Sequence, residues 1–449
     1  MAAYNTDIIL AQIEQALERE DLTSAIRILE ALKPVDQAEV FDDLDTEDQV
    51  NLLPNLDPAV SADILENLDE SDAAELVSSL PQDYAIRVID EMEPDEAADL
   101  LGDIPPEKAQ TFLQELENPE EVRPLLIHPD ESAGGLMTSE YLALRRGMTA
   151  SEAIEAIRQW KPEDESIYYL FVVDSERKLC GVVSLRQLIV AHPDARLGDI
   201  MDAEVISVLA GTDQEEVARI MSRYDLLALP VVDHAGRLIG VITVDDVIDV
   251  VVDEATEDIQ RLGGAQPLTQ PYLRSSILSV ARKRIGWLLL LFVTESLTGT
   301  VLRHFEAELQ AAVALAFFVP LLIGTGGNAG SQTTSTIIRA LALGEIDLKD
   351  ALRSLWHELR VGLALGLGMA VFAYARALTW GSAPDLATTV SIAILTIVVW
   401  ANALGAILPI LAAKFKIDPT VVSGPVMSTL VDATGLFIYF KIAGIIMGL

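Results

Sequence analysis

The chain has 449 residues, with 69 Asp and Glu against 31 Lys and Arg, and a formal net charge of −38. The charge is uneven, because 59 acidic and 18 basic residues lie in 1–270, whereas 10 and 13 lie in 271–449. An acidic part of this kind repels nucleic acid phosphates and attracts divalent cations, so we expect no nucleic-acid partner. The single cysteine, Cys180, excludes internal disulfides.

Residues 1–137 contain a short internal repeat. An apolar residue begins each unit and is followed by Asp, Pro or Glu, residue types that favour a helix N-terminus. The repeated positions are evenly spaced, at Leu44, Leu56, Leu68, Leu80, Met92 and Ile104. The spacing predicts stacked short helices that form a right-handed superhelix.

A second duplication, with a longer period, follows the repeat. Val172-Val173-Asp174 matches Val231-Val232-Asp233, and Gly181-Val182-Val183-Ser184 matches Gly240-Val241-Ile242-Thr243 at the same spacing. Each copy predicts a helix, two strands and a second helix, and the pair resembles two CBS modules at 138–200 and 201–262.

CBS pairs commonly bind adenine nucleotides through a Ser/Thr-x-x-Asp element. The second module has Thr243 and Asp246, which makes ATP a candidate ligand there. The first module has Ser184 and Gln187 and lacks the carboxylate.

The helix that leaves the second module is acidic along one face. Asp245, Asp249 and Asp253 recur every four residues, and like charges at this spacing destabilise a helix unless cations neutralise them. Asp246, Glu254, Glu257 and Asp258 widen the face. A solvated acidic face is the alternative interpretation. The position favours cation binding, because this connecting helix, over 251–279, leads directly into apolar segments.

Residues 280–449 contain five apolar segments long enough to span a membrane. They are 285–302, 312–343, 355–378, 388–412 and 420–449. Basic residues flank them on one side, which predicts an inner-membrane protein of bacterial type with a cytoplasmic N-terminal part and an external C-terminus. The expected fold class is mostly α, with a helical superhelix, an α/β CBS pair and a five-helix transmembrane domain in a lipid bilayer.

Asp432 lies alone in the fifth apolar segment, where an ionisable side chain is costly and usually lines an ion path. We expect a cation site there; an Asp that is protonated or paired with a neighbouring helix is the alternative. Asp418, at the start of this segment, is a candidate second cation position. Glu295 is an unexpected charge within the first segment.

The stretch Gly324–Thr336 of the second segment has no charge but is rich in Gly, Ser, Thr, Asn and Gln. Glycines allow close helix approach, and the polar groups are suited to a wet path. Interhelical hydrogen bonding without conduction is the alternative. The predicted pore-lining residues are Asn328, Ser331, Ser335 and Gly424.

The order of these parts resembles the MgtE family of magnesium channels. Matching stretches are Glu131–Thr138, Thr212–Arg219, Glu254–Ile259, Gly324–Gly330 and Asp432–Gly435. The resemblance implies a homodimeric Mg2+-selective channel that cytosolic Mg2+ closes, with Asp432 of each subunit in the pore. Gly424 departs from the Asn that some relatives have near the pore.

The resemblance also implies regulatory Mg2+ sites between the superhelix, the CBS pair and the connecting helix. The matching positions are Asp63, Asp95, Asp99, Asp213, Glu215, Asp225, Asp246, Asp249, Glu254, Glu257 and Asp258.

Other functions remain open at this point. A carrier of another divalent ion, Co2+ or Mn2+, is the nearest alternative, although ligands that are all oxygen favour hard ions. An anion channel would need basic residues along the path. An enzyme is not expected, since the five histidines are scattered and no catalytic arrangement is visible. A membrane-tethered sensor without transport is the last alternative.

Overall fold

The computed structural model describes residues 6–160, 169–268, 272 and 275–448. The chain divides into two compact units, Met1–Val251 and Val252–Leu449, which are treated separately below. Parts of four predictions fall outside the described residues: positions 1–5 of the helical repeat region, 161–168 of the first CBS module, 269–271 and 273–274 of the connecting segment, and Leu449 of the fifth span.

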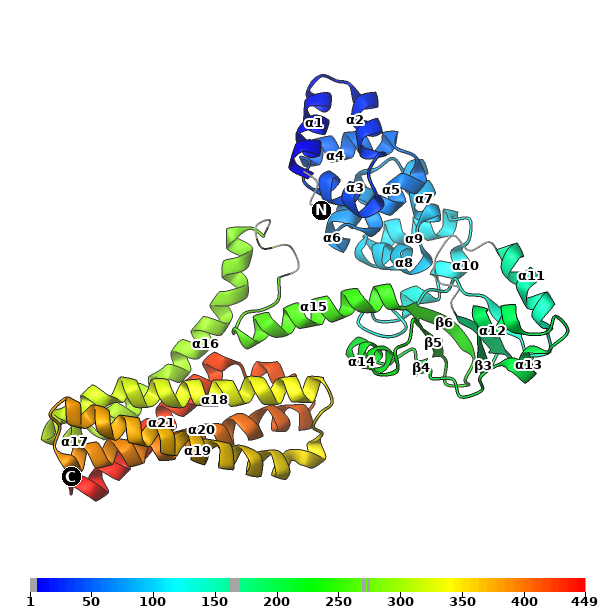
Figure 1. The fold of residues 1–449 in the computed structure, drawn as a ribbon. Coiled ribbons are helices and arrows are strands. Elements are labelled where there is room, and N and C mark those ends of the chain that lie inside the picture. The colour runs from blue at the N-terminus through cyan, green and yellow to red at the C-terminus, as the bar shows by residue number, and fades with distance from the viewer. Residues whose placement is uncertain (1–5, 161–168, 269–271, 273–274, 449) are drawn as a thin grey trace. The chain divides into compact units, whose positions relative to one another are not determined.

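The first unit begins with short stacked helices (Figure 1). They are α1 (Thr6–Glu18), α2 (Leu22–Leu29), α3 (Pro34–Asp42), α4 (Thr46–Leu52), α5 (Pro58–Glu66), α6 (Glu70–Ser79), α7 (Gln82–Glu91), α8 (Pro94–Asp103), α9 (Pro106–Glu115) and α10 (Pro119–Val122). From α5 to α9 the first residues of the helices recur at the interval of the sequence repeat, as predicted.

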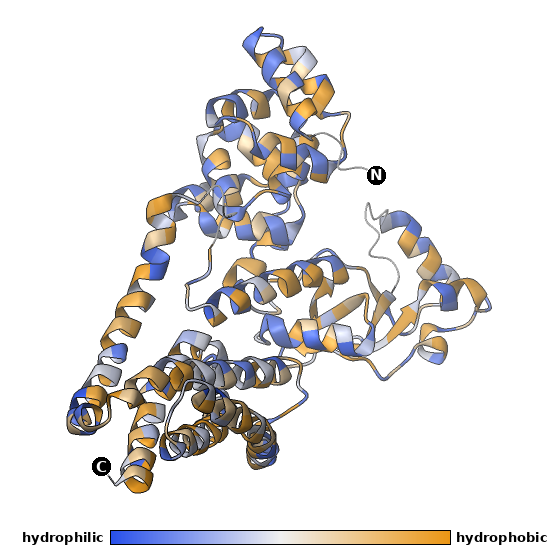
Figure 2. Ribbon diagram, turned by 60° about the vertical axis from the view of Figure 1, so that its left-hand side comes forward, coloured by the Kyte–Doolittle hydropathy of each residue, from blue (hydrophilic) through white to orange (hydrophobic). Residues whose placement is uncertain are grey.

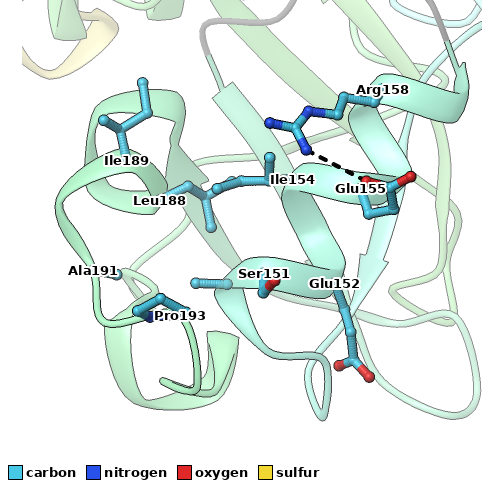
Figure 3. A pocket seen from close by; sticks show the side chains of 10 residues that line it. Ser151, Glu152, Ile154, Glu155, Arg158, Leu188, Ile189, Ala191 and Pro193 are labelled. Atoms are coloured by element: carbon cyan, nitrogen blue, oxygen red, sulfur yellow. Dashed lines mark hydrogen bonds and ion pairs between the residues drawn. The ribbon is translucent and has the colours of Figure 1, made fainter.

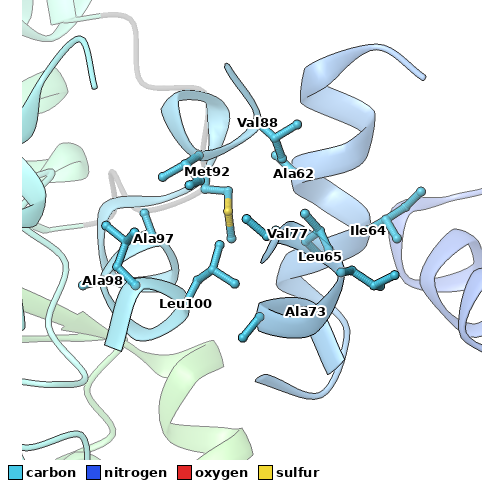
Figure 4. Packing of buried hydrophobic residues seen from close by; sticks show 14 of the residues in the cluster. Ala62, Ile64, Leu65, Ala73, Val77, Val88, Met92, Ala97, Ala98 and Leu100 are labelled. Atoms are coloured by element: carbon cyan, nitrogen blue, oxygen red, sulfur yellow. The ribbon is translucent and has the colours of Figure 1, made fainter. Parts of the chain in front are cut away.

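The repeat produces this stack through caps and buried apolar side chains. Asp57 and Asp69 each accept a hydrogen bond from a backbone N–H of the first helical turn, at 3.2 Å. The repeated Leu56, Leu80 and Met92 are buried between helices. Figure 4 shows this packing around Met92, where apolar side chains of neighbouring helices face one another.

Two similar three-stranded sheets follow. The first module contains β1 (Ala143–Arg145), α11 (Ala150–Trp160), β2 (Tyr169–Val173), β3 (Leu179–Ser184), α12 (Leu185–Val190) and α13 (Leu197–Ile200). The second contains β4 (Val208–Leu209), α14 (Gln214–Tyr224), β5 (Ala228–Val232), β6 (Leu238–Thr243) and α15 (Val244–Leu262). In both sheets the first pairing is parallel and the second antiparallel, in the same register.

Each module is completed by the segment that precedes the other. Met201 packs on Gly181, and Met137 packs on Gly240, so closely that a Cβ at either glycine would lie within 2.4 Å of the methionine sulfur. Thr138 also donates its backbone N–H to the Val241 carbonyl at 2.9 Å. The two modules therefore share one packing arrangement.

Among the described residues of the second unit, five helices are long and apolar enough to cross a membrane. The long helices are α16 (Ile277–His304), α18 (Val319–Ala342), α19 (Ala351–Thr379), α20 (Pro384–Lys414) and α21 (Gly424–Met447), with the short α17 (Glu306–Ala311) between the first two. In Figure 2 the helices of the membrane-spanning bundle are coloured mainly orange and white, with little of the hydrophilic blue. The predicted fold class and the five spans are confirmed.

Two boundaries differ clearly from the predictions. The connecting helix, predicted over 251–279, ends as α15 at Leu262, and the last residues of that range belong to α16. Helix α16 begins at Ile277, well before Ile285, the predicted start of its apolar segment. Ser276 caps it by accepting the Ser279 N–H at 3.2 Å, so the basic residues before the span belong to the helix. Hydropathy therefore predicts where the apolar segment begins, whereas the capping residue Ser276 shows where the helix begins.

We expect Gly240→Ala to destabilise the protein by about 1–3 kcal/mol, because the new methyl group must displace the buried Met137. Gly211→Ala, in the same module, is the control, since nothing lies within 4 Å of its Cβ position. Denaturant unfolding of the purified full chain measures both. Equal stability of the two variants would contradict the packing described here.

Candidate cation sites

The first candidate site is a group of carboxylates on α8. Asp95 is 8% exposed, and its Oδ1 atom has no hydrogen-bond partner among the described residues. Asp246, at the start of α15, is the neighbouring charge that acts most strongly on Asp95. Glu96 and Asp99 extend the group along α8. Asp95 is the neighbouring charge that acts most strongly on Glu96. This set of Asp95, Glu96, Asp99 and Asp246 is called the α8 cluster below.

The α8 cluster is electrostatically unfavourable when its members are ionised. Burial, and then repulsion by Asp246, raises the pKa of Asp95 to about 7. Burial and repulsion by Asp95 raise the pKa of Glu96 to about 9. Burial and repulsion by Glu70 raise the pKa of Asp99 to about 7. A bound cation would remove this repulsion, because an opposite charge within a few ångströms favours the ionised carboxylate.

Of the predicted first-unit residues, the structure brings Asp95, Asp99 and Asp246 together, with Asp249 as a further charge acting on Asp246. Glu96 was not among the predicted site residues, because nothing in the repeat distinguishes it from the other acidic residues of these helices. No group of three or more His, Cys, Asp or Glu arranged for a metal is found in the described part of the chain. Cation binding by the α8 cluster therefore stays a prediction.

Four other predicted residues lie elsewhere in the first unit. Asp63 is partly exposed on α5. Asp213 caps α14 by accepting the Glu215 N–H at 3.0 Å, and Asp225 ends the same helix in a left-handed conformation at φ 51°. Asp213 and Asp225 lie about 18 Å apart along this helix, so they do not share one site with each other.

The predicted nucleotide element has a structural role in both modules. Thr243 donates its hydroxyl to Asp246 Oδ2 at 2.5 Å, and Ser184 and Gln187 form the equivalent capping box at the start of α12. Gln187 thus replaces the carboxylate as a helix cap.

A cavity of about 410 Å³ lies between α11 and α12 of the first module (Figure 3). Its wall combines Leu188 and Ile189 with Glu152, Glu155 and Arg158. None of the predicted site residues lines it, and two carboxylates make it a poor site for phosphate.

The second candidate site is in the second unit, where the end of α15 meets the turn before α21. Arg261 forms ion pairs with both Glu257 and Asp418. Burial, followed by repulsion from Asp418 and Glu254, raises the pKa of Asp258. Although burial alone raises the pKa of Asp418, hydrogen bonds with Thr420 and Arg261 lower it overall. These acidic residues and Arg261 are called the α15 end cluster.

Arg261 changes the interpretation of this cluster. The sequence predicted a cation at Asp418, and the guanidinium already supplies one positive charge there. A metal ion at this position would compete with Arg261 or bind on the Asp258 side. The signal was present in the sequence, because Arg261 follows Glu257 by four residues, a spacing that pairs charges on a helix.

The third candidate site is Asp432, in the first half of α21. The glycines of α18 pack directly against its neighbours: a Cβ at Gly326 would lie 2.7 Å from Val431, and one at Gly330 would lie 2.9 Å from Met427. These glycines therefore allow close helix packing beside the half-buried Asp432. Glu295 of α16 is the charged side chain whose field reaches Asp432, which places a second carboxylate near this position.

Three of the four predicted pore-lining residues lie on one side of α18, and the fourth, Gly424, begins α21. Asn328 and Ser335 are exposed and Ser331 is partly exposed, at helical spacings that align them along one face. Ser331 donates its hydroxyl to the Gly424 carbonyl at 3.2 Å, so Gly424 contributes a backbone oxygen at this level. One membrane carboxylate was missed, Glu358 of α19, which binds Thr333 and Asn402 on another side of α18.

Three family models match the chain. One described as a divalent cation transporter matches residues 319–442, an MgtE intracellular N domain matches 32–131, and CBS domains match 133–194 and 197–253. The magnesium transporter MgtE of Thermus thermophilus is 45% identical over 327 residues, which cover 73% of this chain and 72% of that protein. The chain belongs to the MgtE family. The MgtE protein of Bacillus subtilis is 36% identical over 72% of this chain.

Solved structures of magnesium-transporting proteins match the first part of the chain. The cytosolic domain of the Mg2+ channel MgtE in complex with ATP has a TM-score of 0.51 at 39% identity, covering 54% of this chain and 99% of that one. The soluble part of a magnesium transporter has a TM-score of 0.50 at 33% identity, covering 56% and 100%. The family assignment made from the sequence is confirmed.

The α8 cluster of this MgtE protein predicts a pH-dependent stability in chelator. The folded chain raises the pKa of Asp95, Glu96 and Asp99, so their favourable contribution is present below about pH 4 and is lost as pH rises through about 7 and 9. We expect the free energy of unfolding to fall by a few kcal/mol between about pH 5 and 9.

The measurement is thermal unfolding of the full chain across this pH range. Glu96→Gln should flatten the dependence, whereas Glu107→Gln, at an exposed position of α9, should leave it unchanged. If Glu96→Gln and wild type showed the same pH dependence of stability, the α8 cluster would not be its cause.

Proposed function

We propose that this chain transports Mg2+ across a membrane through a path that passes Asp432. The observation that supports this most directly is the placement of Asp432, the one acidic residue of α21, beside the glycine-rich α18 with its exposed polar face. Relatives that cover most of the chain are named magnesium transporters.

The chemistry of the path favours a hard cation. Asp432, the α18 amide and hydroxyls and the Gly424 carbonyl offer oxygen ligands. Mg2+ loses its water shell reluctantly, so a wide polar path can hold the hydrated ion through its waters. Co2+ is less favoured, because no His or Cys lies among these residues, whereas Mn2+ accepts the same oxygen ligands and is distinguished from Mg2+ by the flux measurement below.

The proposal includes a homodimer. Asn328, Ser331 and Ser335 leave a polar face of a membrane-spanning helix uncovered in the single chain. Lipid cannot satisfy such groups, so a second copy or water must cover them. A twofold axis along this face would add a second Asp432 to the same path.

We propose that Mg2+ also closes the path from the N-terminal side. Ionised, the α8 cluster and the α15 end cluster repel internally, and Mg2+ would stabilise the arrangement in which their carboxylates are close. A ligand shifts a conformational equilibrium only through its differential affinity for the two states. Several weak sites together would supply the roughly 5 kcal/mol that moves a population almost fully.

The orientation follows from this role, with the first unit and the regulatory ions in the cytoplasm and the C-terminus outside. ATP is proposed as a ligand of the CBS pair, since a relative's cytosolic domain is known with ATP. In this chain the Thr243 hydroxyl and backbone N–H both donate to Asp246 Oδ2, so the proposed ribose hydroxyl would bind Oδ1.

Asp432→Asn should reduce Mg2+ flux into liposomes by at least about tenfold, because it removes the charge that stabilises the ion in the membrane. Flux is followed with an Mg2+-sensitive dye inside vesicles, with Mn2+ and Co2+ tested in parallel. Asp385→Asn, at an exposed position in the first turn of α20, is the matched control.

Wild-type flux in Asp432→Asn would reject Asp432 as the ion site. Flux of Mn2+ or Co2+ without flux of Mg2+ would reject Mg2+ as the transported ion. Absence of flux for any ion in a folded wild type would favour a sensor.

Asp95→Asn should weaken closure by Mg2+, because it removes one buried carboxylate of the α8 cluster. We expect the Mg2+ concentration that halves flux, applied on the side of the first unit, to rise about tenfold, the effect of losing about 1.4 kcal/mol of binding. Asp194→Asn, at a highly exposed position, is the control. The same half-inhibiting concentration in Asp95→Asn and wild type would remove the α8 cluster from regulation.

A further inference from the structure

A partly buried carboxylate lies between three membrane helices, away from the proposed path. Glu358 of α19 accepts hydrogen bonds from Thr333 Oγ1 of α18 at 3.2 Å and from Asn402 Nδ2 of α20 at 3.3 Å. Thr333 lies two residues after Ser331, which rotates it by about 200° around the helix. The three residues therefore lie behind α18, on the side away from its exposed polar face.

The hydrogen bonds in this group do not satisfy its polar atoms. Asn402 is 1% exposed, and its Oδ1 atom has no partner among the described residues. Hydrogen bonds to a carboxylate are normally about 2.5–2.9 Å long, so the two contacts of Glu358 are long. Across the described residues, no Lys, Arg or His within ion-pair distance neutralises Glu358.

Two glycines bring the three helices together at this point. A Cβ at Gly362, one turn after Glu358, would lie 3.1 Å from the Cβ of Asn402. A Cβ at Gly405, one turn after Asn402, would lie 2.7 Å from the Gly330 carbonyl and 3.0 Å from Thr333. Close helix packing at these two glycines therefore brings the three polar side chains together.

We propose that Glu358, Asn402 and Thr333 bind a small monovalent cation, of which Na+ is the test case. A flip of the Asn402 amide exchanges Oδ1 and Nδ2, which have nearly the same shape, and turns Oδ1 toward Glu358. A carboxylate, an amide oxygen and a hydroxyl then form a hard-oxygen ligand set from three helices.

The charge of the site selects a monovalent ion. One carboxylate balances one positive charge, whereas Mg2+ would leave an excess charge between membrane helices, where charge is costly. Mg2+ also requires octahedral geometry at about 2.0–2.1 Å, which would draw oxygens closer together than the 3.2–3.3 Å separations here. A bound monovalent ion would link α18 to α19 and α20 on the side of α18 that lies away from its exposed polar face.

The test is thermal unfolding of the full-length protein in detergent, with chelator present and no divalent ions. NaCl is compared with N-methylglucamine chloride at equal ionic strength, because the bulky cation screens surface charges but does not fit the site. We expect Na+ to raise the melting midpoint saturably by about 2–4 °C. Glu358→Gln and Thr333→Val, which keep the side-chain shapes, should each remove the difference.

Ser391→Ala is the matched control, because Ser391 also forms a hydrogen bond between α20 and α19, to the Ala370 carbonyl at 2.8 Å. This variant should keep the full Na+ effect. Equal midpoints in the two salts for wild type, or a Na+ effect that survives in Glu358→Gln, would overturn the proposal and leave a hydrogen-bonded contact between helices. The outcome does not depend on whether Asp432 conducts Mg2+.

Discussion

Repulsion between buried carboxylates is the interaction on which the proposed mechanism depends. In the α8 cluster it raises the pKa of Glu96 to about 9, far above the value of a carboxyl in water. The folded chain keeps such groups together only by protonating them or by binding cations. Protonation relieves the repulsion at neutral pH, because the pKa of Glu96 lies above 7. Cation binding is the second means, and the proposed response to Mg2+ rests on it.

In the second unit, too, carboxylates need an opposite charge, but the two carboxylates Asp418 and Asp432 differ in whether the chain supplies one. Asp418 receives the positive charge of Arg261, which is fixed in the chain and does not depend on free ions. Asp432 has no such partner among the described residues, and the other charge that acts on it, Glu295, has the same sign. A carboxylate left without a fixed cation in a membrane domain attracts a mobile one. This contrast separates a position that anchors the end of α15 from a position suited to transport.

The sequence predicted most of the fold because its signals are local and periodic. The short repeat gives the starts of α5 to α9, and the longer duplication gives the register of both sheets. The candidate sites were predicted less completely, because burial and pairing depend on residues distant in sequence. Arg261 neutralises Asp418 across 157 residues, and Glu358 meets Asn402 across 44. A lone polar residue in an apolar segment does not show which helix it will face.

Helix α15 joins the two kinds of acidic site. It carries Asp246 of the α8 cluster near its start and Asp258 of the α15 end cluster near its end, within one uninterrupted helix of 19 residues. The stretch between these two residues spans about 18 Å along the helix axis. One continuous helix therefore supplies carboxylates to both clusters.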